Sequence, residues 1–234
     1  MPAVSRENRK EAVPYAHYLE RYRALNPHEA AGRCGLPFDE KTGAFSLRFM
    51  GTPYAVPHPD FDLRPPEPAL TPAPGQKTGV PGLIPGPAAG IPVPVAKETA
   101  ERILLLRYLC EGRLRAPSGA PLSYHDIPSG GVYYRNFEGR CLKRLAGLFG
   151  KDLPGFRAVM EGPVIRGQPL GRGDAGYRFE FITGIFMYMI LWGADEEFPA
   201  SAQILFDENF PAAFTAEDAA VAGEAAIERL KALR

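Results

Sequence analysis

The sequence has no excess of charge of either sign. Its 234 residues include 27 lysines and arginines and 27 aspartates and glutamates, which gives a formal net charge of zero at neutral pH. A protein that binds a nucleic-acid backbone or an anionic membrane surface needs a basic field or stripe, and this sequence contains neither. We therefore expect no nucleic-acid partner and no membrane partner.

Cysteine and histidine are also scarce. The three cysteines form no C-x-x-C pair, and the four histidines have no H-x-x-x-H spacing. These patterns argue against a disulfide framework and a structural zinc site. They indicate a reducing compartment, in which the thiols pack as small apolar side chains. The residues concerned are Cys34, Cys110, Cys141, His17, His28, His58 and His125.

Long apolar segments are missing as well. The longest apolar run, residues 182–194, is shorter than the roughly 20 residues that cross a bilayer. The N-terminal residues lack the apolar core of a signal peptide. We expect a cytoplasmic protein. Because 45% of its residues are hydrophobic, the chain can bury a real core as one domain, residues 1–234.

One segment within that domain has a different composition. Residues 57–94 contain 12 prolines and 5 glycines, which neither a helix nor a central strand tolerates. We interpret residues 57–95 as a proline- and glycine-rich insertion or loop. It is a surface-draped insertion without a chemical role, or else a lid, a wrapping arm or a flexible insertion.

The spacing of apolar residues predicts helices and strands in alternating blocks. Asn26-Pro27 is typical of a helix start, Met50-Gly51 of a hairpin turn, and Thr215 with Asp218 of a capping box. We expect an α+β domain with a mainly antiparallel sheet flanked by helices, and with the proline-rich insertion. The predicted helices cover residues 5–33 in two pieces, 97–111, 137–149, a segment from 156, and 215–233; the predicted strands cover 45–49, 54–56, 177–182, 185–192 and 203–206.

The strongest functional signal is an apolar run that ends in three consecutive carboxylates, Asp195, Glu196 and Glu197. In an extended backbone Asp195 and Glu197 share one face, where they could bind a hard cation such as magnesium or share a proton. Asp207, at the end of the next apolar run, joins them if the strand ends meet. The alternative is that the strand end is simply solvated, or that one carboxylate pairs with a distant arginine.

Trp192 immediately precedes these acids and is the only tryptophan. We expect it in the core, with its indole N–H satisfied by a nearby acceptor. A ring packed against the carboxylates would raise their pKa values, which is one route to a general acid.

Two further motifs have simpler interpretations. Residues 171–176 match G-x-G-x-x-G, but they precede a predicted strand, so the phosphate-binding helix of the dinucleotide fingerprint is missing. Residues 123–126, Ser-Tyr-His-Asp, together with residues 129–131, Ser-Gly-Gly, supply the residue types of a hydrolase triad, but adjacent residues rarely reach triad geometry. Both motifs are more typical of turns.

The sequence also resembles a known family. The resemblance is carried by LWGADEEFPASAQILFD, the TAEDAAVAGEAAIERL helix, the FSLRFMGTPYAV hairpin and the ERILLLRYLCEG helix, with W-x-x-DEEFP as its signature. The family is DUF3786, an uncharacterised bacterial and archaeal domain of unknown function. Some members look fused to iron–sulfur modules similar to those of corrinoid proteins, which implies a link to tetrapyrrole or redox metabolism. This chain has no cysteine-rich module with which to hold such a cluster itself.

Three functions remain open. The first is a small-molecule-binding or accessory protein with its pocket near the acids. The second is a metal-assisted or acid–base enzyme that uses Asp195 or Glu197. The third is an interaction protein whose proline-rich arm binds a protein partner. The sequence identifies no cofactor and no oligomeric state. The candidate ligand-binding residues are Trp192, Asp195, Glu196, Glu197, Asp207, His125, Arg135 and Arg140, with Asp195 and Glu197 as the candidate metal ligands and His125, Arg135 and Arg140 for an anionic substrate.

Overall fold

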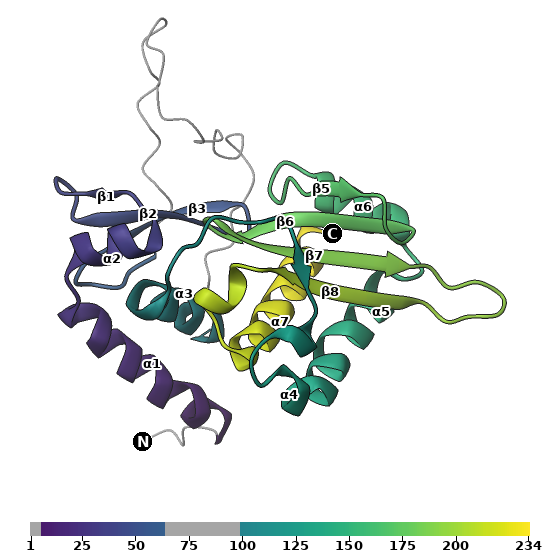
Figure 1. Cartoon of the computed structure of the whole chain (residues 1–234), viewed down its shortest axis with the longest axis horizontal. Helices are drawn as coiled ribbons and strands as arrows, with labels where there is room; N and C mark the ends of the chain where they lie inside the picture. The colour runs from purple at the N-terminus through teal and green to yellow at the C-terminus, as the bar shows by residue number, and fades with distance from the viewer. Residues whose placement is uncertain (1–5, 64–98) are drawn as a thin grey trace, which may run out of the picture.

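The structure is a computed structural model, and it describes residues 6–63 and 99–234 (Figure 1). Helices and groups of strands follow one another along the chain, and the strands form one antiparallel sheet. This confirms the predicted α+β class. The insertion predicted at residues 57–95 lies mostly outside the described residues. The helices are α1 (Arg6–Ala24), α2 (Pro27–Cys34), α3 (Thr99–Glu111), α4 (Gly130–Phe137), α5 (Lys143–Phe149), α6 (Leu153–Glu161) and α7 (Ala216–Leu233).

The described strands pair antiparallel throughout. Their order across the sheet is β1-β2-β6-β7-β8-β4, while β3 pairs with β2 and β5 pairs with β6. The strands are β1 (Phe38–Asp39), β2 (Ala44–Phe49), β3 (Thr52–Pro57), β4 (Pro121–Leu122), β5 (Gln168–Leu170), β6 (Ala175–Ile182), β7 (Ile185–Trp192) and β8 (Ser201–Asp207).

Local signals place several element ends where the sequence predicts them. The Asn26 side chain accepts hydrogen bonds from the backbone N–H groups of His28 and Glu29, and α2 begins at the next residue, Pro27. Thr215 and Asp218 form both hydrogen bonds of a capping box at the start of α7. These bonds satisfy N–H groups that a helix start leaves without partners.

One helix starts earlier than predicted. The sequence predicts it over residues 137–149, but α4 already begins at Gly130, and a π-helical turn, Glu138–Leu142, joins α4 to α5. The Ser-Gly-Gly segment suggested a turn. The packing explains the glycine, because a Cβ at Gly130 would lie 1.8 Å from the backbone oxygen of Tyr124. This glycine permits a close approach of two backbone segments rather than breaking the helix.

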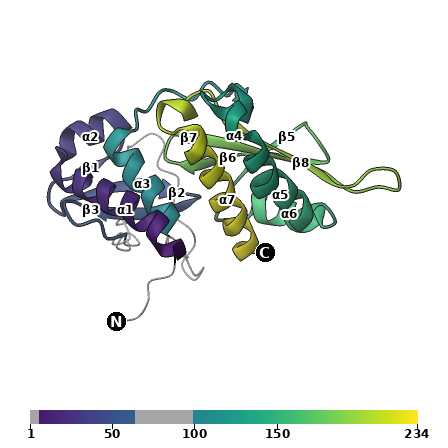
Figure 2. The same cartoon turned by 90° about the horizontal axis from the view of Figure 1, so that it is seen from below.

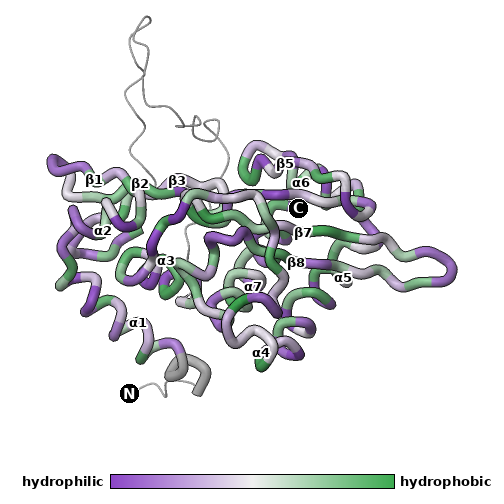
Figure 3. The backbone as a smooth tube through the Cα atoms, in the orientation of Figure 1, coloured by the Kyte–Doolittle hydropathy of each residue, from purple (hydrophilic) through white to green (hydrophobic). Residues whose placement is uncertain are grey.

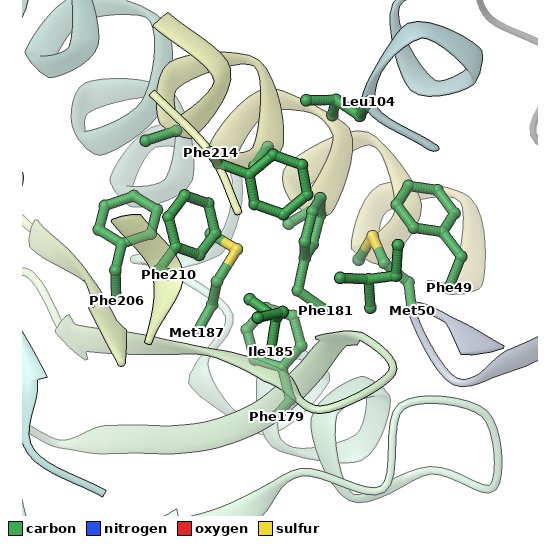
Figure 4. Packing of buried hydrophobic residues seen from close by; sticks show 14 of the residues in the cluster. Phe49, Met50, Leu104, Phe179, Phe181, Ile185, Met187, Phe206, Phe210 and Phe214 are labelled. Carbon is green, nitrogen blue, oxygen red and sulfur yellow. The ribbon is translucent and has the colours of Figure 1, made fainter. Parts of the chain in front are cut away.

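The core lies between the sheet and α7. Along β6, β7 and β8, alternate side chains face the helices, and Figure 4 shows them packed against two phenylalanines that precede α7. The rings of Phe206 and Phe210 are 4.6 Å apart, and those of Phe210 and Phe214 are 5.0 Å apart. All three side chains are buried. This continuous aromatic layer explains why the sequence is so apolar after residue 177.

Helix α7 occupies the centre of the helical layer. Seen from below, it lies between α3 on one side and α5 and α6 on the other (Figure 2). Most residues of its buried face are alanine or glycine, and at Gly223 a Cβ would lie 2.8 Å from the Cys141 sulfur. The small residues thus let the neighbouring helices approach α7 closely.

The turn between β2 and β3 makes a second close contact, with the backbone of Val164, and this contact can be tested. Met50 and Gly51 both have positive φ, as the predicted hairpin turn requires, and a Cβ at Gly51 would lie 1.8 Å from the Val164 backbone oxygen. We expect Gly51→Ala to lower the free energy of unfolding by about 2–4 kcal/mol, since it adds both backbone strain and a clash.

Gly32→Ala is the matched control, because nothing lies within 4 Å of a Cβ at this position in α2. It should leave stability unchanged or raise it by up to about 1 kcal/mol. Urea denaturation of both variants measures the difference, and equal effects would contradict the packing role of Gly51.

Candidate functional site

The three consecutive carboxylates lie in the loop between β7 and β8, which projects from the end of the sheet (Figure 1). The backbone turns there: the Asp195 N–H donates to the Phe198 carbonyl over 3.0 Å. The Asp195 Oδ1 atom accepts from the N–H groups of Glu197 and Phe198 over 2.9 and 2.6 Å. The extended backbone predicted for this segment is therefore wrong. Asp195 and Glu197 are therefore not held on one face by the alternation of an extended strand. The Asp195 carboxylate instead accepts hydrogen bonds from the backbone of the turn that Asp195 begins.

Asp207 does not join these acids. The register of β7 and β8 pairs Trp192 with Ser201 and Met187 with Phe206, so Asp207 lies at the opposite end of β8. Ser201 and Asp207 are six positions apart along β8, which corresponds to about 20 Å. The hypothesis that both strand ends contribute carboxylates to one site is wrong, because an antiparallel hairpin places them at opposite ends.

Asp207 is instead the centre of a buried hydrogen-bond network. It is fully buried, and its carboxylate accepts from the N–H groups of Ser118 and Gly119 over 3.1 and 3.0 Å. It also accepts from the Tyr188 hydroxyl over 3.1 Å, and it lies 3.7 Å from the Arg178 guanidinium. The carboxylate thus fixes the segment that follows α3 to the end of the sheet. This matches the alternative of a carboxylate paired with an arginine from elsewhere.

Asn209 also attaches the segment that follows α3 to the sheet. Its Nδ2 atom donates to the carbonyl groups of Arg115 and Gly184 over 2.9 and 2.8 Å. Burial, as the largest cause, raises the pKa of Tyr188 in this network, and the neighbouring Asp207 raises it further. Each of these contacts joins backbone segments, so the network supports the fold.

Trp192 is also not where we expected it. Its relative exposure is 39%, and Phe198 at the other side of the loop is 65% exposed. Trp192 follows Tyr188 and Ile190 on the outer face of the sheet, whereas the core of the protein lies on the inner face. The prediction of a core tryptophan is wrong because strand alternation places Trp192 on the outer face of the sheet, at the end of β7, and not against the main core.

Two of the three remaining candidate residues contact other side chains of the described chain. His125 stacks on Tyr134 with ring centroids 4.0 Å apart. Arg140 pairs with Glu224 of α7, with a 2.7 Å bond from Nε. Arg135 is exposed on α4. All three lie in the helical layer, away from the β7–β8 loop (Figures 1 and 2). The convergence that the enzyme hypothesis required of them and the acids does not occur.

Residues 123–126 and 171–174 form turns, as predicted, whereas Gly130 and Gly131 of the Ser-Gly-Gly segment belong to α4. Asp126 accepts hydrogen bonds from the backbone N–H and the hydroxyl of Ser123 over 2.8 and 2.7 Å, which lower the pKa of Asp126. Residues 171–174 form bends before β6. Within residues 6–63 and 99–234, no three His, Cys, Asp or Glu side chains are grouped so that they could hold a metal ion.

The cysteine thiols are protected by the fold. Cys34 and Cys141 are buried and Cys110 is partly buried. Burial raises the pKa of Cys34 and Cys110 to about 11 and that of Cys141 to about 12. At neutral pH such thiols are protonated and weakly nucleophilic.

The structure adds one feature that the sequence did not reveal, a hollow of about 430 Å³. It lies where α3, the start of α4 and the start of α7 meet. Six of its ten lining residues are apolar, and the polar ones are Arg107, Ser129, Thr215 and Glu217. The apolar residues are Ile127, Pro128, Tyr133, Pro211, Phe214 and Ala216.

The positive charge of Arg107 at the hollow is compensated by two carboxylates. The Arg107 guanidinium donates to the Asp218 carboxylate over 2.6 Å and lies 3.7 Å from Glu111. Burial, as the largest cause, raises the pKa of Asp218, although Thr215 and Arg107 oppose the shift. Ser129 adopts a positive φ of 69° and makes no side-chain hydrogen bond to the helix that it precedes. The Ser129 hydroxyl therefore does not cap its helix, whereas the Thr215 hydroxyl caps α7.

A family model matches residues 89–229, more than half of the chain. The chain belongs to DUF3786, a domain of unknown function. The DUF3786 match contains α3 through most of α7, and therefore both the hollow and the β7–β8 loop. The β2–β3 hairpin lies outside the matched residues. No curated protein and no solved structure matches the chain. No helix among the described residues is long and apolar enough to cross a membrane.

Substitution of Asp207 and of Asp195 tests whether the two side chains differ in their contribution to stability. We expect Asp207→Ala to lower the free energy of unfolding by about 3–5 kcal/mol, because it removes the shared acceptor of several buried donors and the partner of Arg178. Asp195→Ala removes two hydrogen bonds in an exposed turn and should cost about 1 kcal/mol. Equal losses in urea denaturation would contradict the assignment of Asp207 as the buried hub.

Proposed function

We propose that this protein binds a small molecule in the hollow between α3, α4 and α7. The observation that carries the proposal is a hollow of about 430 Å³ whose wall combines apolar side chains with nearly as much polar surface. Ligand sites in proteins commonly have this size, and their polar groups orient the ligand. The sequence-based hypothesis of a binding or accessory protein is retained, with its pocket moved away from the acidic loop.

The lining indicates the chemistry of the ligand. Tyr133 is 47% exposed, so its ring offers a face against which a flat, apolar group can stack. Ser129 and Glu217 lie at the same wall and supply hydrogen-bonding groups. Because Arg107 is already paired with Asp218, it supplies no free positive charge. We therefore propose a mostly apolar, ring-containing molecule that needs no negative charge.

The family resemblance narrows the first compounds to test. It implies a link to tetrapyrrole, corrinoid or redox metabolism, and the uncharged ring-containing compounds of redox metabolism suit a hollow that has an exposed tyrosine and no free positive charge. We include them in the proposal as the first ligand class to examine.

The experiment begins with native mass spectrometry of the protein purified from its own host. We expect a bound organic compound of defined mass, which can then be identified and titrated back. Tyr133→Ala should weaken its binding about tenfold, because one ring contact is worth about 1 kcal/mol or more. Val132→Ala is the matched control, since Val132 is the neighbouring exposed residue and does not line the hollow.

Two results would contradict this function. One is protein from the native host that carries no compound. The other is a bound compound whose affinity is the same in Tyr133→Ala and in the wild type.

A further inference from the structure

The β7–β8 loop carries an unusual concentration of exposed aromatic surface. Among the described residues, five large apolar side chains are exposed, and two of them, Trp192 and Phe198, flank this loop. The loop projects beyond the helices in two perpendicular views (Figures 1 and 2). No helix or strand of the described chain covers it. Exposed aromatic side chains of this kind are enriched at protein–protein interfaces.

Two hydrogen bonds attach the start of the loop to the body of the protein. The Gly193 N–H donates to the Asp174 carboxylate over 2.8 Å, and the Ala194 N–H donates to the Gly150 carbonyl over 3.3 Å. The hydrogen bonds of Asp195 to Glu197 and Phe198 order the turn within the loop. A preorganised surface loses little conformational entropy when it binds.

Trp192 continues a buried strip on the outer face of the sheet. Tyr188 and Ile190, which precede it by four and two residues, are buried and cluster with Leu205. Because side chains alternate along a strand, Trp192 extends this strip into solvent. Its backbone position is therefore fixed by packing, while its side chain remains available to a partner.

The charges of the loop define the partner. Residues 193–200 include Asp195, Glu196 and Glu197 and no lysine or arginine. Asp195 is engaged in the turn, whereas Glu196 and Glu197 are exposed and have no ion-pair partner among residues 6–63 and 99–234. Arg157 lies at the base of the loop, where it donates to the Asp174 carbonyl. Figure 3 shows the hydrophilic tip following the hydrophobic strand β7.

We propose that this loop, residues 192–198, docks into a second protein that presents an apolar cleft with a basic rim. The apolar cleft receives the rings of Trp192 and Phe198, and the basic rim faces Glu196 and Glu197. Like-charge repulsion disfavours anionic membranes, nucleic acids and the same loop of a second copy. This docking site is separate from the hollow, so either assignment can fail without the other.

The first step identifies the partner in the native host. A photo-crosslinking amino acid replaces Phe198 in the full-length chain, and Val132 is the control position because it is 81% exposed in the helical layer. We expect an adduct with one defined protein from position 198 that position 132 does not give. No adduct, the same adduct from both positions, or an adduct only with a second copy of this chain would overturn the proposal.

The second step measures binding of the purified partner by surface plasmon resonance. Trp192→Ala with Phe198→Ala should weaken binding more than tenfold, mainly through faster dissociation, since aromatic anchors dominate interface energies. Glu196→Gln with Glu197→Gln should slow association and reduce its dependence on salt. Val132→Ser should change neither rate. Wild-type rates in both double variants would overturn the proposal even if an adduct had formed.

Discussion

The close approach of α7 to its neighbours is the constraint on which the rest of the structure depends. The sheet supplies large aromatic side chains on its inner face, and α7 supplies small ones, with Gly223 where a Cβ would come within 2.8 Å of the Cys141 sulfur. The large side chains of the sheet and the small side chains of α7 together fill the interior at the packing density of folded proteins. A larger side chain at Gly223 would push α7 away from the π-helical turn, and the helices on both sides of α7 would move with it.

This packing also creates the hollow. Helix α7 begins between α3 and α4, and its first turn includes Asp218, which caps the helix through Thr215 and pairs with Arg107 of α3. One carboxylate thus fixes both the start of α7 and its distance from α3. The wall at Thr215 and Glu217 is therefore held in position relative to α3. A ligand site at this junction would be largely formed before the ligand arrives.

Much of the fold could be predicted from local sequence patterns. The starts of α2 and α7 follow from side-chain caps within three residues, and the β2–β3 turn follows from Gly51. The start of α4 could not be predicted, because Gly130 is required by contact with Tyr124, which only the folded chain brings close. Likewise, the short strand β4 depends on its pairing with β8, since two residues carry no periodic signal.

The candidate site was harder to predict because residue type does not determine environment. Asp195 and Asp207 both follow apolar runs, yet one is exposed and holds a turn of its own loop, while the other is buried and holds a segment almost ninety residues earlier in the chain. Only long-range contacts distinguish them. The sequence predicted an extended backbone at Asp195 and Glu197. The backbone turns instead, because the Asp195 carboxylate accepts hydrogen bonds from two N–H groups that follow it.

This difference determines which charges are available for function. Asp207 has its hydrogen-bonding capacity occupied, and any ligand that used it would have to displace backbone donors or the Tyr188 hydroxyl. Glu196 and Glu197 satisfy no internal donor among the described residues, so binding a cation or a basic side chain would cost the fold nothing. The acids that the sequence made prominent are therefore exposed next to Trp192 and Phe198, where they are accessible to a binding partner.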